Sequence, residues 1–232
     1  MAQAPARPSG PLAELAIVIP VLDRGADLEA TLRALPPVGA VIVVDGGSAD
    51  GSAEVAAEHK AVIVHSAPGR GRQLRAGAEQ AASPWLLFLH ADTRLDAAAW
   101  AEVARVIEQR ATGKAASFRL RLDDAAWQAR LIEFGVRFRV ALLALPYGDQ
   151  GLLIHRSLYA QVGGYRDLPL MEDVDLVRRL GRRRLARLAG TATTSAERWR
   201  RRGWGRQSLA NLRCLLLYTA GVPAERIARM RR

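Results

Sequence analysis

The amino-acid sequence predicts an α/β fold with a mainly parallel central sheet flanked by helices. Between Leu15 and Leu122, short apolar runs alternate with segments of helical periodicity, which is typical of successive βαβ units. The run WLLFL, residues 85–89, is apolar at every position. Such a run is expected of a strand buried on both faces of a parallel sheet, although its periodicity would also fit a buried helix.

The first half of the chain is predicted to contain four strands and four helices. The predicted strands are LAIVIPV (15–21), AVIVV (40–44), AVIVH (61–65) and WLLFL (85–89). Asp27 is expected to cap the first helix, in which Leu28, Leu32 and Leu35 share one face. The other helices are expected to start at Asp50 or Ser52, to span Gly71–Ala82, and to carry Trp100, Val103 and Ile107 on one face.

In the second half of the chain, the periodicity of the apolar residues changes. Phe118, Leu120 and Leu122 alternate with arginines, as in a strand with one solvent-exposed face. A long helix follows, and its apolar stripe is expected to lie in the core rather than to form a binding platform: Trp127, Leu131, Phe134, Phe138 and Leu142. The remaining predictions are a strand at Gly151–His155, a helix at Glu172–Leu180, and one or two helices over Arg206–Arg232 split near Gly221 and Pro223.

Size and composition favour one domain with an appendage. The chain has 232 residues, half of them hydrophobic, enough for a full core. We expect residues 1–13 to be a flexible leader, 14–194 the main domain and 195–232 a basic helical appendage. The single cysteine, Cys214, excludes an internal disulfide framework and fits a reducing compartment, so a cytoplasmic protein is expected. No apolar run reaches the length of a membrane span.

Positive charge is concentrated at the C-terminal end. Residues 1–177 carry 18 basic and 21 acidic groups, whereas residues 178–232 carry 16 arginines and two glutamates, within a net charge of +11. Such a segment is suited to phosphate, an anionic membrane surface or nucleic acid, or it is a solvated arginine-rich surface. A polyanion-binding protein is therefore one hypothesis for the function. The arginines lack interleaved aromatic residues beyond Trp199 and Trp204, which argues against nucleic acid.

Polar residues follow two of the predicted strands, at the sheet edge where α/β proteins bind ligands. Asp45 ends the second strand in VIVVDGGSADGS, where it is placed to contact a base or ribose, and Asp50 follows in a turn. His90 and Asp92 follow the fourth strand, and in an extended chain they would point the same way. One carboxylate with substrate phosphates suits Mg²⁺, and Mn²⁺ also accepts imidazole. Asp92 as a mere helix cap is the alternative.

Two further clusters have both a chemical and a structural interpretation. In APGRGRQLRAG, Gly69 and Gly71 lack the third glycine of a dinucleotide fingerprint and follow the third strand rather than the first, which excludes that interpretation. Arg70 or Arg72 could still hold a phosphate at a helix start. In the cluster MEDVD, residues 171–175, one carboxylate is a candidate general base, although acidic residues also favour a first helical turn.

In this order, the clusters resemble a family 2 glycosyltransferase of the GT-A type from Ala16 to Trp199. VIPVLDRGADLEATL is similar to that family's first strand and helix, VIVVDGGSADGS to its nucleotide-binding turn and GRGRQLRAGAEQA to its third helix. LFLHADTRL resembles the strand with the DxD metal motif, and GDQGLLIHRSLYAQVGGYRDLPLMEDVDL the acceptor-side segment ending in the ED motif. The chain also resembles small stand-alone bacterial proteins associated with arsenosugar biosynthesis.

The resemblance implies roles for individual residues. Asp173 becomes the catalytic base with Glu172 assisting, and Asp92 becomes a ligand of Mn²⁺ or Mg²⁺, with His90 as a second ligand. The implied donor-binding residues are Pro20, Leu22, Asp45, Gly47, Ser48, Gly71, Arg72, Ala91 and Arg198. The sequence departs from the family pattern in three places: Gly46 replaces a second aspartate, His90 replaces the first acidic residue of DxD, and SAERW (195–199) has serine where a QxxRW motif has glutamine.

The function implied by the resemblance is an inverting, metal-assisted and non-processive transfer of a sugar from a nucleotide-diphosphate donor, expected to be UDP-linked, to an acceptor hydroxyl. The acceptor is expected to be a small molecule or lipid-linked, and no nucleic-acid partner is expected. A sugar-phosphate nucleotidyltransferase is an alternative, but PVLDRGAD lacks its glycine-rich phosphate loop. The terminal helices are expected to pack on the sheet domain or on a second subunit, with peripheral contact at the inner face of the membrane as the alternative.

Overall fold

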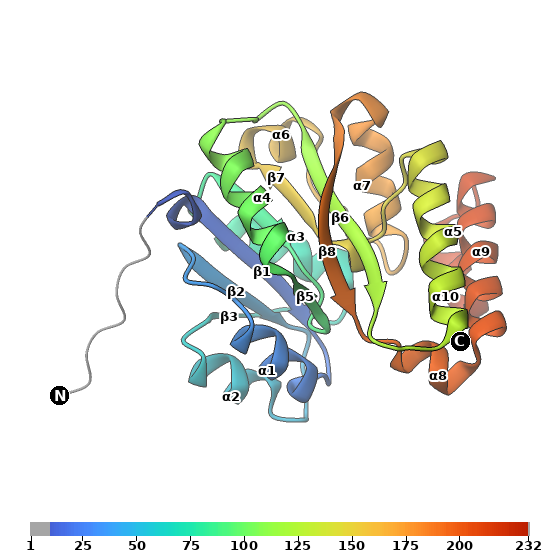
Figure 1. Cartoon of the computed structure of the whole chain (residues 1–232). Helices are drawn as coiled ribbons and strands as arrows, with labels where there is room; N and C mark the ends of the chain where they lie inside the picture. Colours follow the sequence, from blue (N-terminus) through green and yellow to red (C-terminus); the bar gives the residue numbers. More distant parts are fainter. Residues whose placement is uncertain (1–9, 232) are drawn as a thin grey trace.

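A computed structural model describes residues 10–231 of the chain. Its centre is an eight-stranded sheet in the order β3-β2-β1-β4-β7-β6-β8-β5 (Figure 1). The strands are β1 (Leu15–Val21), β2 (Ala40–Asp45), β3 (Val62–His65), β4 (Trp85–Phe88), β5 (Thr93–Leu95), β6 (Ala115–Leu122), β7 (Leu152–His155) and β8 (Leu185–Thr194). The α/β prediction and all six predicted strands are therefore confirmed, whereas β5 and β8 were not predicted.

Pairing is parallel in one half of the sheet and mixed in the other. Strand β1 pairs in parallel with both β2 and β4, and β2 pairs in parallel with β3. Strand β7 is antiparallel to β4 and β6, while β8 runs parallel to β6 and antiparallel to β5. The chain therefore leaves β1 first toward β2 and later toward β4, and ligand crevices open at such a reversal of strand order.

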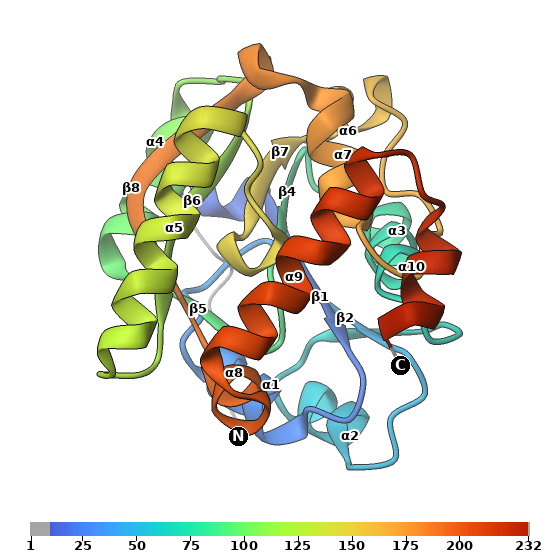
Figure 2. The same ribbon diagram turned by 90° about the vertical axis from the view of Figure 1, so that its right-hand side faces the viewer.

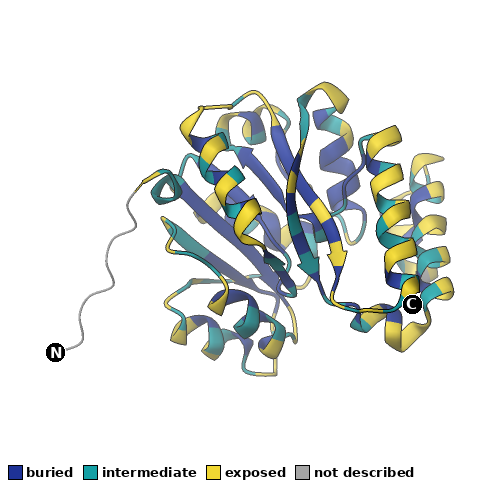
Figure 3. Cartoon of the chain, in the orientation of Figure 1, coloured by how far each residue is buried: buried dark blue, intermediate teal, exposed yellow. Residues whose placement is uncertain are grey.

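Alternating side chains of β1 pack into two separate hydrophobic cores, one on each face of the sheet. Leu15, Ile17 and Ile19 pack on one face of the sheet, and Ala16 and Val18 pack on the other. The first face is covered by α1 (Gly25–Arg33), α2 (Ser52–Glu58) and α4 (Ala97–Glu108), and the second by α3 (Arg70–Gln80), α6 (Arg156–Gln161) and α7 (Glu172–Leu180). A sheet covered on both faces explains why β1 is buried along its whole length (Figure 3).

The C-terminal segment forms α8 (Glu197–Arg202), α9 (Trp204–Thr219) and α10 (Ala224–Arg231). The predicted break falls between α9 and α10, at Gly221 and Pro223. Cys214 and Leu215 of α9 pack with Val174 and Val177 of α7. Figure 2 shows α9 and α10 lying over the edge of the sheet domain. The terminal helices therefore pack on this domain, one of the two expected arrangements, although Leu209, Leu212 and Leu216 of α9 remain exposed.

The predicted core stripe of the long helix is wrong. Helix α5 (Trp127–Leu143) forms as predicted, but all five stripe residues are between 54% and 70% exposed: Trp127, Leu131, Phe134, Phe138 and Leu142. Only Ala129 and Val140 of this helix are buried. Periodicity shows that apolar residues share one face of a helix, but it cannot show whether another element covers that face.

Two local predictions are also corrected. Arg24, not Asp27, is the N-cap residue of α1, and Asp27 lies in the first turn, where it accepts a hydrogen bond from Arg24 Nη1 at 3.1 Å. In the predicted leader, residues 1–9 lie outside the described residues, but Pro11–Glu14 form a 3-10 helix and Leu12 packs against the core. Within residues 10–231, no helix combines the length and the apolar character needed to cross a bilayer.

Candidate active site

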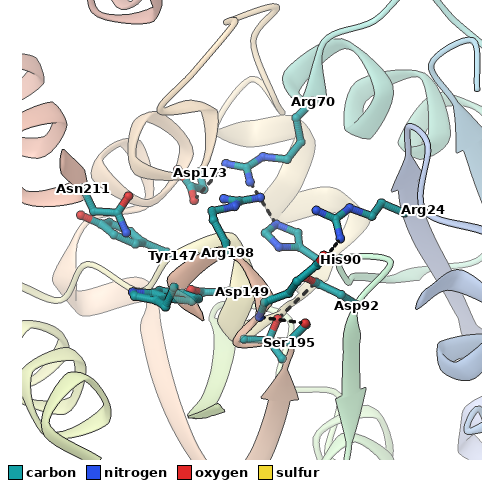
Figure 4. A pocket seen from close by; sticks show the side chains of 13 residues that line it. Arg24, Arg70, His90, Asp92, Tyr147, Asp149, Asp173, Ser195, Arg198 and Asn211 are labelled. Carbon is teal, nitrogen blue, oxygen red and sulfur yellow. Dashed lines mark hydrogen bonds and ion pairs between the residues drawn. The ribbon is translucent and has the colours of Figure 1, made fainter. Parts of the chain in front are cut away.

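The carboxyl end of β4 opens into a small polar cavity of about 70 Å³, at the reversal of strand order (Figure 4). Segments far apart in the sequence supply its walls: Arg24, Arg70, His90, Asp92, Asp149, Asp173 and Arg198. The structure therefore brings four predicted site residues together, namely His90, Asp92, Asp173 and Arg198. Arg24, Tyr147, Asp149 and Asn211 also line the cavity, and the sequence did not single them out for this site.

Asp92 lies between β4 and β5 and faces this cavity. Its Oδ1 accepts hydrogen bonds from the hydroxyl groups of Thr194 at 3.2 Å and Thr93 at 3.4 Å. Burial raises the pKa of Asp92, and the hydrogen bond from Thr194 partly offsets that rise. Asp96 caps α4 by accepting a hydrogen bond from the backbone N–H of Ala99 at 2.7 Å. The alternative in which Asp92 is only a helix cap is therefore wrong.

His90 is held in its neutral form. Burial, and then the charges of Arg70 and Arg198, lower the pKa of His90 well below its ordinary value. Arg70 Nη1 lies 3.4 Å from His90 Nε2. Because a guanidinium can only donate, Nε2 is the acceptor, and the single proton of the ring is then on Nδ1.

Arg70 connects helix α3 to the two acidic residues that begin α7. It forms an ion pair with Glu172, whose side chain is 1% exposed, and its Nη2 lies 3.6 Å from Asp173 Oδ2. Burial raises the pKa of Glu172, and Arg70 counteracts the rise. Burial lowers the pKa of Arg70, but its charge interactions with both carboxylates outweigh this effect and raise it. Of the two arginines considered for a phosphate role, Arg70 is therefore the one at the cavity.

Asp173 is fixed by backbone donors. Its Oδ2 accepts a hydrogen bond from Gly148 N at 2.8 Å, and its Oδ1 accepts one from Val174 N at 2.7 Å. Figure 4 shows its carboxylate beside the guanidinium of Arg70. Glu172 does not line this cavity but lines the wider cleft that adjoins it.

Asp149 is the functional candidate that the sequence did not single out. It lies in a 3-10 helix, Gly148–Gln150, directly before β7. Burial raises the pKa of Asp149 to about 6, although Arg139 counteracts this effect. Its Oδ1 is buried and has no hydrogen-bond partner among the described residues. Asp149 belongs to the segment GDQG directly before β7, and nothing local in that segment relates it to β4. The antiparallel pairing of β7 with β4 places the start of β7, and with it Asp149, beside the carboxyl end of β4.

A wider cleft of about 810 Å³ adjoins the cavity and is rich in arginine. Five arginines and two glutamates line it: Arg24, Arg70, Arg198, Arg201, Arg202, Glu172 and Glu197. The first three of these arginines also line the cavity. Three of the five come from the basic C-terminal segment, so part of its charge faces this site. Clustered guanidinium groups form charge-assisted and often bidentate hydrogen bonds with phosphate.

The predicted nucleotide-binding turn lines neither the cavity nor the arginine-rich cleft. Asp45 Oδ1 accepts hydrogen bonds from Ser48 N at 3.0 Å and from Ser48 Oγ at 2.5 Å. Gly47 adopts φ = +92°, a conformation that favours glycine. A β-carbon on Gly46 would lie 3.0 Å from Nε2 of Gln73, which itself donates to the carbonyl groups of Val21 and Val44 near the ends of β1 and β2. Gln73 thus occupies the space that a side chain at residue 46 would need.

The other residues predicted to bind the donor do not line the cavity or the arginine-rich cleft. Pro20 is buried within β1, whereas Leu22 is 44% exposed. The Ala91 carbonyl accepts a hydrogen bond from Thr31 at 2.7 Å. Gly71 packs against the backbone, because a β-carbon there would lie 2.3 Å from Arg166 O. Arg72 forms an ion pair with Asp167 at 2.7 Å on the surface.

The donor atoms of the cavity fit a divalent cation bound by one protein carboxylate. Asp92 lines the cavity with a carboxylate whose Oδ1 accepts from Thr194 and Thr93, whereas His90 Nε2 faces Arg70. Across residues 10–231, no three His, Cys, Asp or Glu side chains are gathered into a metal-binding group. A cation here would therefore need donor phosphates to complete its shell, which is a normal arrangement for Mg²⁺.

The sequence also matches a known protein family. The sequence pattern of glycosyl transferase family 2 matches residues 16–162. Uncharacterized glycosyltransferases from Mycobacterium tuberculosis and Mycobacterium bovis are each 39% identical over 82 residues, which is 35% of this chain and 38% of theirs. The match thus spans little more than a third of the length of these relatives.

The fold is similar to that of solved GT-A glycosyltransferases. Residues 1–349 of S. aureus TarS give a TM-score of 0.60 at 13% identity, covering 78% of this chain and 60% of that one. Glucosyl-3-phosphoglycerate synthase from Mycobacterium tuberculosis, solved with Mn²⁺, UDP and glucosyl-3-phosphoglycerate, gives 0.55 at 20% identity, covering 90% and 80%. The family pattern covers more than half of the chain, and the fold is that of the GT-A enzymes. The chain belongs to glycosyl transferase family 2.

Proposed function

We propose that this protein transfers a sugar from a nucleotide-diphosphate donor, most simply a UDP-sugar, to an acceptor hydroxyl, with inversion and without processive polymerisation. The observation that carries the proposal is the meeting of Asp92, Asp149 and Asp173 in one cavity that adjoins an arginine-rich cleft. Such a site offers a proton acceptor on one side and cations for a leaving diphosphate on the other.

The donor is assigned to the arginine-rich cleft and the crevice at the end of β1. Arg24, Arg70 and Arg198 line both the cleft and the cavity, so a diphosphate held by them has its sugar directed toward Asp173. The turn at Asp45 and Ser48 is the proposed contact for the base and ribose. Glucosyl-3-phosphoglycerate synthase and TarS have been solved with UDP, which supports a uridine donor here.

Asp173 is the proposed general base. It accepts the proton of the acceptor hydroxyl while that oxygen forms a bond to the anomeric carbon and the bond from this carbon to the diphosphate oxygen breaks. The diphosphate leaves with the electron pair, and a single displacement inverts the configuration. A general base contributes roughly 10² to 10⁴-fold to the rate. Glu172 assists by holding Arg70 in place.

Asp92 is the proposed ligand of a divalent cation, Mn²⁺ or Mg²⁺, together with the donor phosphates. When bound, the cation would neutralise charge on the leaving diphosphate. Glucosyl-3-phosphoglycerate synthase has been solved with Mn²⁺ beside UDP, which supports this role. We retain His90 as a second candidate ligand, although its Nε2 accepts from Arg70 in the present geometry.

We also propose that residues 14–194 form the glycosyltransferase domain and residues 195–232 a helical appendage that completes its site. Arg198 and Trp199 of α8 and Asn211 of α9 line the cavity. The appendage arginines therefore belong to the proposed donor site rather than to a separate polyanion-binding surface.

The experiment is a screen of UDP-, GDP- and dTDP-sugars for donor hydrolysis and for thermal stabilisation with Mn²⁺. We expect one UDP-sugar to be hydrolysed and UDP with Mn²⁺ to raise the melting temperature. The proposal would be contradicted if the protein neither hydrolysed nor was stabilised by any nucleotide sugar and instead bound polyanions in general, with an affinity that falls steeply as the salt concentration rises.

A further inference from the structure

Two neighbouring helices present apolar side chains that no described residue covers. The stripe of α5 is more than half exposed, and on α9 Leu209, Leu212 and Leu216 are 50–67% exposed. Helices α5 and α9 lie side by side in Figures 1 and 2, and Figure 3 shows exposed residues along both. Soluble proteins rarely leave a contiguous patch of this kind without a ligand or partner for it.

The two helices form the walls of a groove of about 650 Å³. Its lining is predominantly apolar and includes Leu131, Phe138 and Leu142 of α5 and Trp204 and Leu212 of α9. Small-molecule sites commonly have volumes of roughly 300 to 1,000 Å³ and apolar walls. The groove thus has the size and character of a ligand site rather than of a packing defect.

The groove is continuous with the proposed catalytic cavity. Tyr147, Asp149, Trp199 and Asn211 line both spaces. At this inner end, Arg139 Nη2 and Asp149 Oδ1 are buried without a hydrogen-bond partner among the described residues, one a donor and the other an acceptor. A ligand with a polar head at Asp149 and an apolar tail would satisfy both the polar end and the apolar walls.

A glycine in the middle of α5 widens the groove. Gly135 lines it, and no atom lies within 4 Å of the position that its β-carbon would take. Glycine is unfavourable inside a helix, and neither close packing nor a positive φ requires it here. The absence of a side chain at residue 135 instead leaves space in the groove for a ligand.

The inner end of the groove distinguishes a small amphiphile from a second copy of this chain. Of the five arginines on α5 and α9, Arg139 lines the groove, whereas Arg206 and Arg213 line a separate space beside α10. A second copy would cover the exposed apolar side chains, but a folded surface does not fill a space that leads into a cavity of about 70 Å³. A single-chain amphiphile fits both the apolar groove and its polar inner end.

We propose that the groove between α5 and α9 binds the apolar chain of a lipid acceptor, whose hydroxyl-bearing head lies at Asp149. This inference rests on the proposed sugar transfer and assigns the acceptor to the class of single-chain amphiphiles. The chain lies between the helices, and the head reaches the cavity where Asp173 accepts the proton.

The test uses a matched pair of fluorescent probes, 11-(dansylamino)undecanoic acid and dansylglycine, which share the fluorophore and differ in the chain. The blocking variant is Gly135→Leu, because leucine favours a helix more than glycine does and its side chain enters the groove. The control is Gly113→Leu, at an exposed glycine outside the groove whose β-carbon also meets no atom within 4 Å.

We expect saturable binding of the long-chain probe to the wild type and to Gly113→Leu, with roughly tenfold weaker binding to Gly135→Leu, because losing contact with two methylenes costs about that factor. Dansylglycine should bind weakly to all three proteins. UDP with Mn²⁺ should raise the melting temperature of all three equally, and the long-chain probe should not displace UDP.

Equal probe affinity of Gly135→Leu and Gly113→Leu would overturn the proposal, as would competition between the probe and UDP. Sedimentation velocity tests the other occupant: a wild-type dimer that Gly135→Leu dissociates would make the groove a subunit interface. If the wild type binds the probe but neither binds UDP nor hydrolyses a nucleotide sugar, the proposed sugar transfer fails and with it the acceptor role, although the groove still binds a lipid chain.

Discussion

Gly148 and His90 are in such close contact that a β-carbon on Gly148 would lie 2.6 Å from Nε2 of His90. The same glycine donates its backbone N–H to Asp173 Oδ2 at 2.8 Å. One residue therefore sets the spacing between the segment that follows β4 and the carboxylate that begins α7.

Replacing Gly148 with alanine should separate these two groups. Gly148 does not have a positive φ, so its backbone tolerates a side chain, and the effect should come from the contact with His90. We expect kcat to fall about tenfold or more and stability by roughly 1–3 kcal/mol from overpacking. Steady-state kinetics and thermal melts measure both, with Gly113→Ala as the control. Unchanged kcat would show that the spacing does not matter for catalysis.

Asp173→Asn should slow the chemical step while leaving donor binding nearly unchanged. The amide cannot act as the base, so we expect kcat to fall by roughly 10² to 10⁴-fold while UDP affinity stays within about a factor of three. Calorimetric titration of UDP with Mn²⁺ and a turnover assay give the two values. Loss of UDP binding together with turnover would instead place Asp173 in the donor site.

Asp149 should make stability depend on pH. Burial raises its pKa from 3.8 to about 6. Between about pH 4 and pH 6, Asp149 is protonated in the folded protein and ionised in the unfolded chain. Its contribution to the free energy of unfolding is therefore fully present below about pH 4 and is lost as the pH rises through about 6. Asp149→Asn cannot titrate, so relative to the wild type it should gain up to about 3 kcal/mol between about pH 4 and pH 8. Urea unfolding at several pH values measures this, and parallel pH profiles of the two proteins would exclude a raised pKa.

Asp92→Asn should remove the metal-dependent part of donor binding. For the wild type, we expect UDP to stabilise the fold more strongly with Mn²⁺ than with EDTA, because one carboxylate and the phosphates would share the cation. The variant should lose most of this difference and keep the metal-independent part contributed by the arginines. A tenfold loss of affinity corresponds to about 1.4 kcal/mol. Asp167→Asn, at an exposed surface ion pair, is the control. An undiminished Mn²⁺ effect in Asp92→Asn would argue against metal ligation by this residue.

Arg70→Met should destabilise the fold through Glu172. The Glu172 side chain is 1% exposed and would lose its cation, whereas 32% of the Arg70 side chain is exposed. Breaking a buried pair costs about 3 to 5 kcal/mol, and the partial exposure of Arg70 places the expected loss near the lower end, at about 3 kcal/mol. The double variant Arg70→Met, Glu172→Gln should recover much of this loss in urea unfolding. No recovery would mean that Arg70 stabilises the site by other contacts.

The sequence determined the elements whose signals are local. Apolar runs predicted β1 to β4. Strands β1 and β4 are buried along their whole length, as expected for a sheet covered on both faces, whereas the edge strand β3 is not. The acidic start of α7 and the break at Gly221 and Pro223 were also local signals, and the structure has both. Strand β8 was not predicted, because LARLAGTATT contains small residues that give no strong apolar alternation.

Tertiary structure decided which residues meet and which faces stay uncovered. His90, Asp92 and Asp173 were predicted as site residues because they follow or begin an element predicted from the sequence, and all three line the cavity. Asp149 was not found, because its place at the site depends on the antiparallel pairing of β7 with β4. The α5 stripe was assigned to the core because periodicity reports only a shared face. Whether that face is buried depends on where α9 lies, and the place of α9 is set by its packing on α7, whose residues Val174 and Val177 come about 40 positions earlier in the chain than Cys214 and Leu215.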